Sequence, residues 1–120
     1  MGQNGLEQME SWDGEPAPDF DEDLARGFIG KYLLVGITTV THEGELLSQE
    51  QVHGVIVSAT PVGIDVDLQG SQEGVRWRMP PFLEDLAPAG PGIYRLKASG
   101  ESVENPDFLF TLTVRKPLKQ

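Results

Sequence analysis

The 120-residue sequence predicts an all-β protein: a small five- to six-stranded antiparallel barrel with one helical turn and a disordered acidic N-terminal arm. Two observations support this class. Short runs of alternating apolar and polar residues recur along the chain, and turns rich in glycine and proline separate them. No segment has the long 3.6-residue period of an amphipathic helix. We prefer a barrel to a two-sheet sandwich, because a sandwich normally needs about seven strands and ~100 residues.

The stretch 51–68 has the pattern of a complete β-hairpin. In its second arm the apolar side chains alternate with Asp65 and Asp67, which is typical of a strand with one buried and one solvated face. The first arm is almost uniformly apolar, so we expect it to be the more central of the two. Pro61 and Gly63 favour a tight reversal between the arms.

Four further stretches show strand patterns and complete a set of six strands. The first is β-branched and aromatic, and we expect it to bend at Gly36. In the others every second residue is apolar, which places Trp77 inward and its two arginine neighbours outward. These strands are predicted at 28–40, 75–79, 93–98 and 108–114.

Two short helical segments are predicted between the strands. From residue 19 to residue 26, acidic side chains crowd the first turn and Arg26 lies in the last, which is the charge pattern of a short helix. Residues 82–86 follow Pro80 and Pro81, which end the preceding strand, and are long enough for one helical turn. This turn could cap an open end of the barrel.

Negative charge is concentrated at the N-terminal end of the chain. The net charge is −10, and residues 1–27 account for −7 of it, with eight acidic residues against Arg26 alone. The rest of the chain is mildly acidic and lacks the clustered basic face that nucleic-acid binding requires. The field around the acidic arm favours a cationic partner instead.

Composition limits the remaining possibilities. The chain contains no cysteine, which excludes disulfides and thiolate chemistry. It has neither a signal-peptide pattern nor a window approaching the ~20 apolar residues of a membrane span. We therefore expect a cytoplasmic protein with no membrane association, and we favour a monomer. Four parts are expected: a disordered acidic arm at 1–18, a short helix or linker at 19–27, the barrel at 28–116 and a C-terminal tail at 117–120.

Part of the sequence resembles SH3-like barrels, including Sm-like proteins. The resemblance covers about residues 29–79 and lies in Gly30-Lys31 followed by an apolar strand, then His-Gly-Val-Ile at 53–56 and Gly-Ile-Asp-Val at 63–66. It implies a small barrel, although a matching Sm-type RNA-binding loop is missing. The proline pair at 80–81, with the segments 91–96 and 105–107, is also similar to small bacterial proteins of unknown function. That similarity implies a bacterial source and no particular activity.

The candidate partner-binding residues are exposed charges near the hairpin and two aromatic residues set among acids. The charged residues could present a fixed pattern to a partner, or the arginines could pair with the aspartates across adjacent strands. The aromatic residues could form a short linear motif for a basic partner, or belong to a solvated tail. The six residues are Asp65, Asp67, Arg76, Arg78, Trp12 and Phe20.

Catalytic and metal sites have weaker support. His53 could act as a general base near Asp65 or Asp67, but a hydrogen-bonded strand histidine is the simpler interpretation. His42 lies in an acidic turn that offers few metal ligands. We expect no enzyme activity, catalytic residue, metal or cofactor. The leading hypothesis is a protein-interaction module that binds a cationic protein. The alternatives are an immunity or inhibitor-type protein, and a carbohydrate-binding or hydrolytic barrel using the two aspartates.

Overall fold

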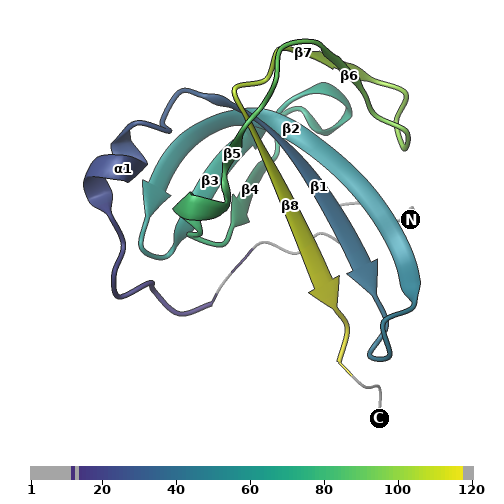
Figure 1. Cartoon of the computed structure of the whole chain (residues 1–120), viewed down its shortest axis with the longest axis horizontal. Coiled ribbons are helices and arrows are strands. Elements are labelled where there is room, and N and C mark those ends of the chain that lie inside the picture. The colour runs from purple at the N-terminus through teal and green to yellow at the C-terminus, as the bar shows by residue number, and fades with distance from the viewer. Residues whose placement is uncertain (1–11, 13, 118–120) are drawn as a thin grey trace.

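The computed structural model describes residue 12 and residues 14–117, and within them it contains eight strands and three short helical segments (Figure 1). The helical segments are α1 (Glu22–Arg26), η2 (Gly70–Gln72) and η3 (Leu83–Asp85). The strands are β1 (Tyr32–Val40), β2 (Leu46–Thr60), β3 (Gly63–Leu68), β4 (Arg76–Met79), β5 (Ala87–Pro88), β6 (Ile93–Arg95), β7 (Ser102–Glu104) and β8 (Phe108–Arg115).

Six of the strands form one open sheet in the order β4-β3-β2-β1-β8-β5, and β6 and β7 form a separate hairpin. The first four strands of the chain pair with their sequence neighbours in antiparallel fashion. β8 then pairs with β1 in parallel, with Leu33 opposite Phe108 and Val40 opposite Arg115. β1, β8 and the first part of β2 run side by side away from α1 (Figure 1).

The core confirms the inferred strand pattern. Ile64, Val66 and Leu68 of β3 are buried, whereas the aspartates between them face outward. Trp77 of β4 is buried opposite Val66. β2 lies between β1 and β3, as expected for the more apolar arm. The main core packs the sheet against α1 and η3, and a smaller cluster of Leu34, Leu96 and Val103 joins the β6–β7 hairpin to the other face.

The all-β prediction is confirmed, but the prediction of a closed, wholly antiparallel SH3-like barrel is wrong. Within the described residues β4 and β5 are the two ends of the sheet, and they do not pair with each other. The chain leaves β4, crosses the molecule through residues 80–107 and enters the sheet beside β1 in parallel. A parallel neighbour requires a long crossover, and alternation of side chains carries no information about strand direction. The strand expected at 93–98 is limited to Ile93–Arg95, and the strand β7 was not predicted.

The N-terminal part of the described chain lies against the sheet. The Trp12 amide donates a hydrogen bond to the carbonyl of Arg78 in β4, and the Ala17 amide donates to the carbonyl of Pro61, both at 2.9 Å. Most of the expected disordered arm, residues 1–11 and 13, lies outside the described residues, as do residues 118–120 of the expected tail. Within the described ranges, no helix has the length and apolar character needed to cross a membrane.

Candidate functional site

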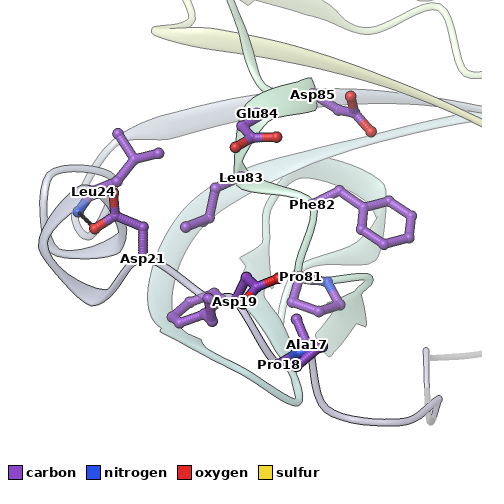
Figure 2. A pocket seen from close by; sticks show the side chains of 11 residues that line it. Ala17, Pro18, Asp19, Asp21, Leu24, Pro81, Phe82, Leu83, Glu84 and Asp85 are labelled. Atoms are coloured by element: carbon purple, nitrogen blue, oxygen red, sulfur yellow. Dashed lines mark hydrogen bonds between the residues drawn. The ribbon is translucent and has the colours of Figure 1, made fainter.

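A groove of about 450 Å³ lies between two segments that are far apart in the sequence. One wall is formed by residues 17–21 and Leu24 of α1, and the other by residues 81–85, which include η3. Figure 2 shows Asp21 and Leu24 at one side of this space and Phe82 at the opposite side. We call this feature the acidic groove. Its volume is within the range of ligand-binding clefts, roughly 300–1,000 Å³.

Local sequence explains why each wall has its shape. The Asp21 carboxylate accepts a hydrogen bond of 3.0 Å from the Leu24 amide and so caps α1 at its N-terminus. On the other wall, the prolines at 80–81 end β4, and the chain turns so that the Phe82 amide donates to the Pro80 carbonyl. The following turn of η3 buries Leu83 in the core. This leaves the neighbouring side chain, Phe82, turned toward solvent.

The groove therefore has apolar surface that the core does not cover. Leu24 is 41% exposed and Phe82 is 43% exposed. Phe20 is partly buried and packs against the core beside them. Half-exposed aromatic and aliphatic side chains grouped in a concave site are typical of binding surfaces, whereas single exposed apolar residues are common everywhere.

Four carboxylates surround this apolar surface, and no basic residue is among the described residues that line the groove. Asp21 uses one oxygen for the helix cap. Within the described part of the chain, the carboxylates of Asp19, Glu84 and Asp85 form no ion pair and accept no hydrogen bond. The nearby Arg26 forms an ion pair with Asp23 instead. The groove thus combines uncompensated negative charge with exposed apolar surface, which suits a ligand that is both cationic and apolar.

Two of the residues that the sequence singled out are associated with this groove. Phe20 lines it directly. Trp12 contacts it from outside, because its ring meets the ring of Phe82 edge to face with centroids 6.0 Å apart. The sequence interpretation missed residues 81–85 as a site, since it assigned the segment to a cap on a barrel. The sequence did contain a signal for this site, because Phe82 and the adjacent acids Glu84 and Asp85 follow the proline pair at 80–81.

The four charged candidates form two cross-strand pairs on β3 and β4. Arg78 holds Asp65 with two hydrogen bonds of 2.7 and 3.1 Å, and Arg76 lies 2.8 Å from Asp67. The Arg78 hydrogen bonds hold the pKa of Asp65 below its usual value, and the Ser58 hydroxyl, 2.9 Å away, acts in the same direction. The arginines therefore pair with the aspartates across adjacent strands, which is one of the two alternatives that the sequence left open. Their role in partner binding stays a prediction, and none of the four is among the described residues that line the acidic groove.

His53 pairs with neither Asp65 nor Asp67. Its Nδ1 lies 2.7 Å from the Tyr32 hydroxyl, and its Nε2 lies 2.7 Å from Glu101. Both ring nitrogens therefore have partners, as expected for a hydrogen-bonded strand histidine. The hydrogen bond from His53 holds the pKa of Glu101 below its usual value, assisted by the Ser71 amide. Burial, together with the negative charge of Glu101, raises the pKa of Tyr32, so this phenol stays protonated at neutral pH.

This cluster attaches the loop before β7 to the main sheet, and sequence reasoning missed it. Glu101 is 48 residues from His53, so no local pattern relates them. His53, Tyr32 and three residues of β7 line a second hollow of about 380 Å³. No group of three potential metal-binding side chains occurs within residues 12 and 14–117, the turn around His42 included.

No family model, curated protein or solved structure matches this chain. A functional interpretation therefore depends on the geometry and charge of the acidic groove.

Proposed function

We propose that the protein is a non-enzymatic interaction module whose acidic groove binds a basic, partly apolar segment of another protein. The observation that carries this proposal is the pairing of two half-exposed apolar side chains, Leu24 and Phe82, with a rim of four carboxylates and no cation among the described lining residues. A peptide with basic and aliphatic side chains satisfies both parts of the surface.

Lysine and arginine suit such a groove because their side chains are amphipathic. The methylene stem of either residue covers apolar surface while its charged end remains near water. Over Phe82, a guanidinium group would gain cation–π attraction, and the carboxylates of Glu84 and Asp85 would accept its hydrogen bonds. The groove volume of about 450 Å³ accommodates a few side chains rather than a whole domain. We therefore expect recognition of a short segment.

The distribution of charge would also increase the rate of association. Residues 1–27 carry a net charge of −7, and three of the four groove carboxylates lie outside the helix cap. Attraction of a basic partner by this field depends on ionic strength, because the Debye length is about 8 Å at physiological salt. An immunity or inhibitor-type protein that blocks a basic enzyme is one form this function could take. A carbohydrate-binding or hydrolytic site at Asp65 and Asp67 has less support, because arginines occupy both carboxylates.

A titration with defined peptides tests the proposal. The probe is a peptide of about ten residues rich in arginine, lysine and leucine, and the comparison peptide has glutamate at each basic position. We expect the basic peptide alone to bind, and its backbone amide chemical-shift changes to map to residues 17–24 and 81–85. Affinity should fall when salt is raised from about 50 to 300 mM.

A matched pair of double variants locates the binding site. Glu84→Gln with Asp85→Asn removes two groove charges, whereas Glu43→Gln with Glu45→Gln removes two exposed charges in the β1–β2 turn. The groove variant should weaken binding by roughly 3- to 10-fold, since each exposed charge pair contributes about 0.2–1 kcal/mol. The turn variant should change affinity less than twofold. Equal weakening by the two variants would contradict the groove as the site.

A further inference from the structure

β8 has a long open edge in the described part of the molecule. On one side it pairs with β1 along its whole length, from Phe108 to Arg115. On the other side β5 covers it only at Phe108 and Leu109. The stretch 110–115 therefore has no neighbour on that side among the described residues, and Figure 1 shows it running free beyond β5.

The direction of the backbone groups along this stretch follows from two observed contacts. The Lys116 amide donates to the Val40 carbonyl of β1, so Lys116 and every second residue before it direct their backbone groups toward β1. Leu109, which pairs with β5, belongs to the alternate set. By this alternation Thr111, Thr113 and Arg115 direct their N–H and C=O groups into the open edge.

Up to Val114, this edge lacks the features with which sheets usually prevent strand addition. Residues 108–114 contain no charged residue, proline or glycine. The side chains are β-branched, aromatic or leucine, and Val114 is 38% exposed. Exposed edges of this kind pair readily with another strand, whereas proline, inward charges and bulges prevent it.

We propose that two copies of the protein associate through β8, with the two β8 strands antiparallel and centred on Thr113. The open outward-facing positions run from Thr111 to Arg115, and Thr113 is their midpoint. In this register Thr113 of one copy lies opposite Thr113 of the other, and Thr111 lies opposite Arg115. All three outward N–H groups of each copy then meet carbonyl groups of the other.

The side chains are self-complementary in the same register. On the face that packs on the core, Leu112 of one copy lies opposite Val114 of the other, which forms apolar cross-strand pairs. No acidic residue occurs between Phe108 and Pro117, so the paired strands bring no negative charges of their own together. The two copies of Arg115 are four residues apart along the ladder, about 14 Å, which exceeds the Debye length of about 8 Å at physiological salt.

The association closes after two copies. The opposite end of the sheet, β4, has its Arg78 carbonyl bonded to Trp12 and is followed by the prolines at 80–81. A twofold pairing uses the open edge of each copy against the other, so it forms a dimer with one continuous sheet rather than a fibre. This inference is independent of the acidic groove, which is formed by other residues.

The test measures association of the full-length chain and of two variants at one position. Sedimentation from about 5 to 500 µM should show the weight-average mass rising from one chain toward two. Thr113→Pro removes an N–H that faces the open edge, and should give a single chain at every concentration. Thr113→Val keeps the N–H and should dimerise as the parent does. Circular dichroism and thermal melting verify that each variant is folded.

Crosslinking provides a second measurement that does not depend on the proline variant folding. The chain has no cysteine, so Thr113→Cys introduces one thiol at the proposed twofold axis. Under mild oxidation it should form covalent dimers at least tenfold faster than Ala98→Cys, an exposed position near the β6–β7 hairpin. A single chain at all concentrations, association that survives Thr113→Pro, or equal crosslinking rates would each overturn the proposal.

Discussion

The outer edges of β4 and β8, at the two sides of the sheet, differ in how they meet their surroundings. β4 is four residues long, precedes a double proline, and receives a hydrogen bond from Trp12 on its outer side. β8 is eight residues long and uncharged until Arg115, and β5 covers only its first two residues. One small sheet can therefore have one protected edge, at β4, and one edge that is suited to pairing, at β8. Short length, proline and a covering segment distinguish the first from the second.

The side chains of β4 also hold this strand more firmly in the sheet than those of β8 do. Its outward arginines are held by the aspartates of β3, and its inward Trp77 is buried opposite Val66. β4 is thus fixed from both faces and from its edge. β8 is fixed by its inward residues, by β1 and, at its first two residues, by β5, which leaves the rest of its outer edge available.

We expect the largest loss of stability from a substitution that disrupts the buried packing between β3 and β4. Val66→Asp places an unpaired carboxylate at a position that is 0% exposed, opposite Trp77. Burial of an unpaired charge costs more than a small domain can tolerate, so we expect the chain to be unfolded at 25 °C. Circular dichroism with thermal melting measures this.

Asp65→Ala provides the neighbouring control, because it removes a partly exposed side chain that faces outward. It loses the hydrogen bonds with Arg78 and Ser58, and should lower the free energy of unfolding by about 1–2 kcal/mol while leaving the fold intact. Similar melting temperatures for the two variants would mean that the register of β3 is shifted by one residue.

Removing the N-terminal segment that covers the outer edge of β4 should cause an intermediate loss of stability. A chain that begins at residue 19 loses the Trp12 and Ala17 hydrogen bonds, and the contact between the Trp12 and Phe82 rings. We expect it to fold with a free energy of unfolding lower by about 1–3 kcal/mol. Because both edges are then open, sedimentation should detect species larger than a dimer.

Trp12→Ala in the full chain separates the contribution of the Trp12 ring from that of its backbone hydrogen bond. It removes the ring contact but keeps the backbone amide that bonds to Arg78, so it should be destabilised without forming the larger species. Larger assemblies from this variant as well would indicate that the indole ring, and not the backbone, protects the edge.

Low pH should destabilise the attachment of β4 to β3 and leave the proposed pairing of two β8 strands unchanged. The folded-state pKa of Asp65 is below its unfolded value, so its stabilising effect is complete above about pH 4 and is lost as pH falls through the folded-state pKa. Glu101 acts in the same direction. Between residues 108 and 114 no group titrates, so dimerisation should not vary with pH while the chain remains folded.

Urea unfolding at about pH 7, 4 and 3 measures this smaller effect. Asp65→Asn should give a shallower loss of stability toward low pH than the parent, because it cannot be protonated. An identical pH dependence in the two proteins would show that the Asp65–Arg78 pair does not contribute to acid sensitivity.

The sequence predicted features that depend on neighbouring residues. Alternation at 64–68 identified the buried and solvated sides of β3, and Pro61 with Gly63 marked the turn before it. The pairing of Asp65 with Arg78 followed from assuming that the next strand was antiparallel. Each of these inferences needed only local periodicity and one strand connection.

Features that join distant residues could not be predicted in this way. The parallel pairing of β8 with β1, the bond between His53 and Glu101, and the walls of the acidic groove depend on the path of residues 80–107. Strand periodicity is the same for parallel and antiparallel neighbours, so it could not separate a closed barrel from an open sheet. Phe20 was identified as an aromatic residue among acids, but its partners on the opposite wall were not.

The parallel pairing of β1 with β8 also bears on how the protein is made. Leu33 and Phe108, which lie opposite each other, are 75 residues apart in the chain. While the ribosome is still adding those residues, the hairpins of β1 to β4 can form, but the second side of β1 has no partner. Contacts of such long range slow folding and prolong the exposure of unpaired strands. We therefore expect β8 to join the sheet late, and nascent chains that end before it to depend on chaperones.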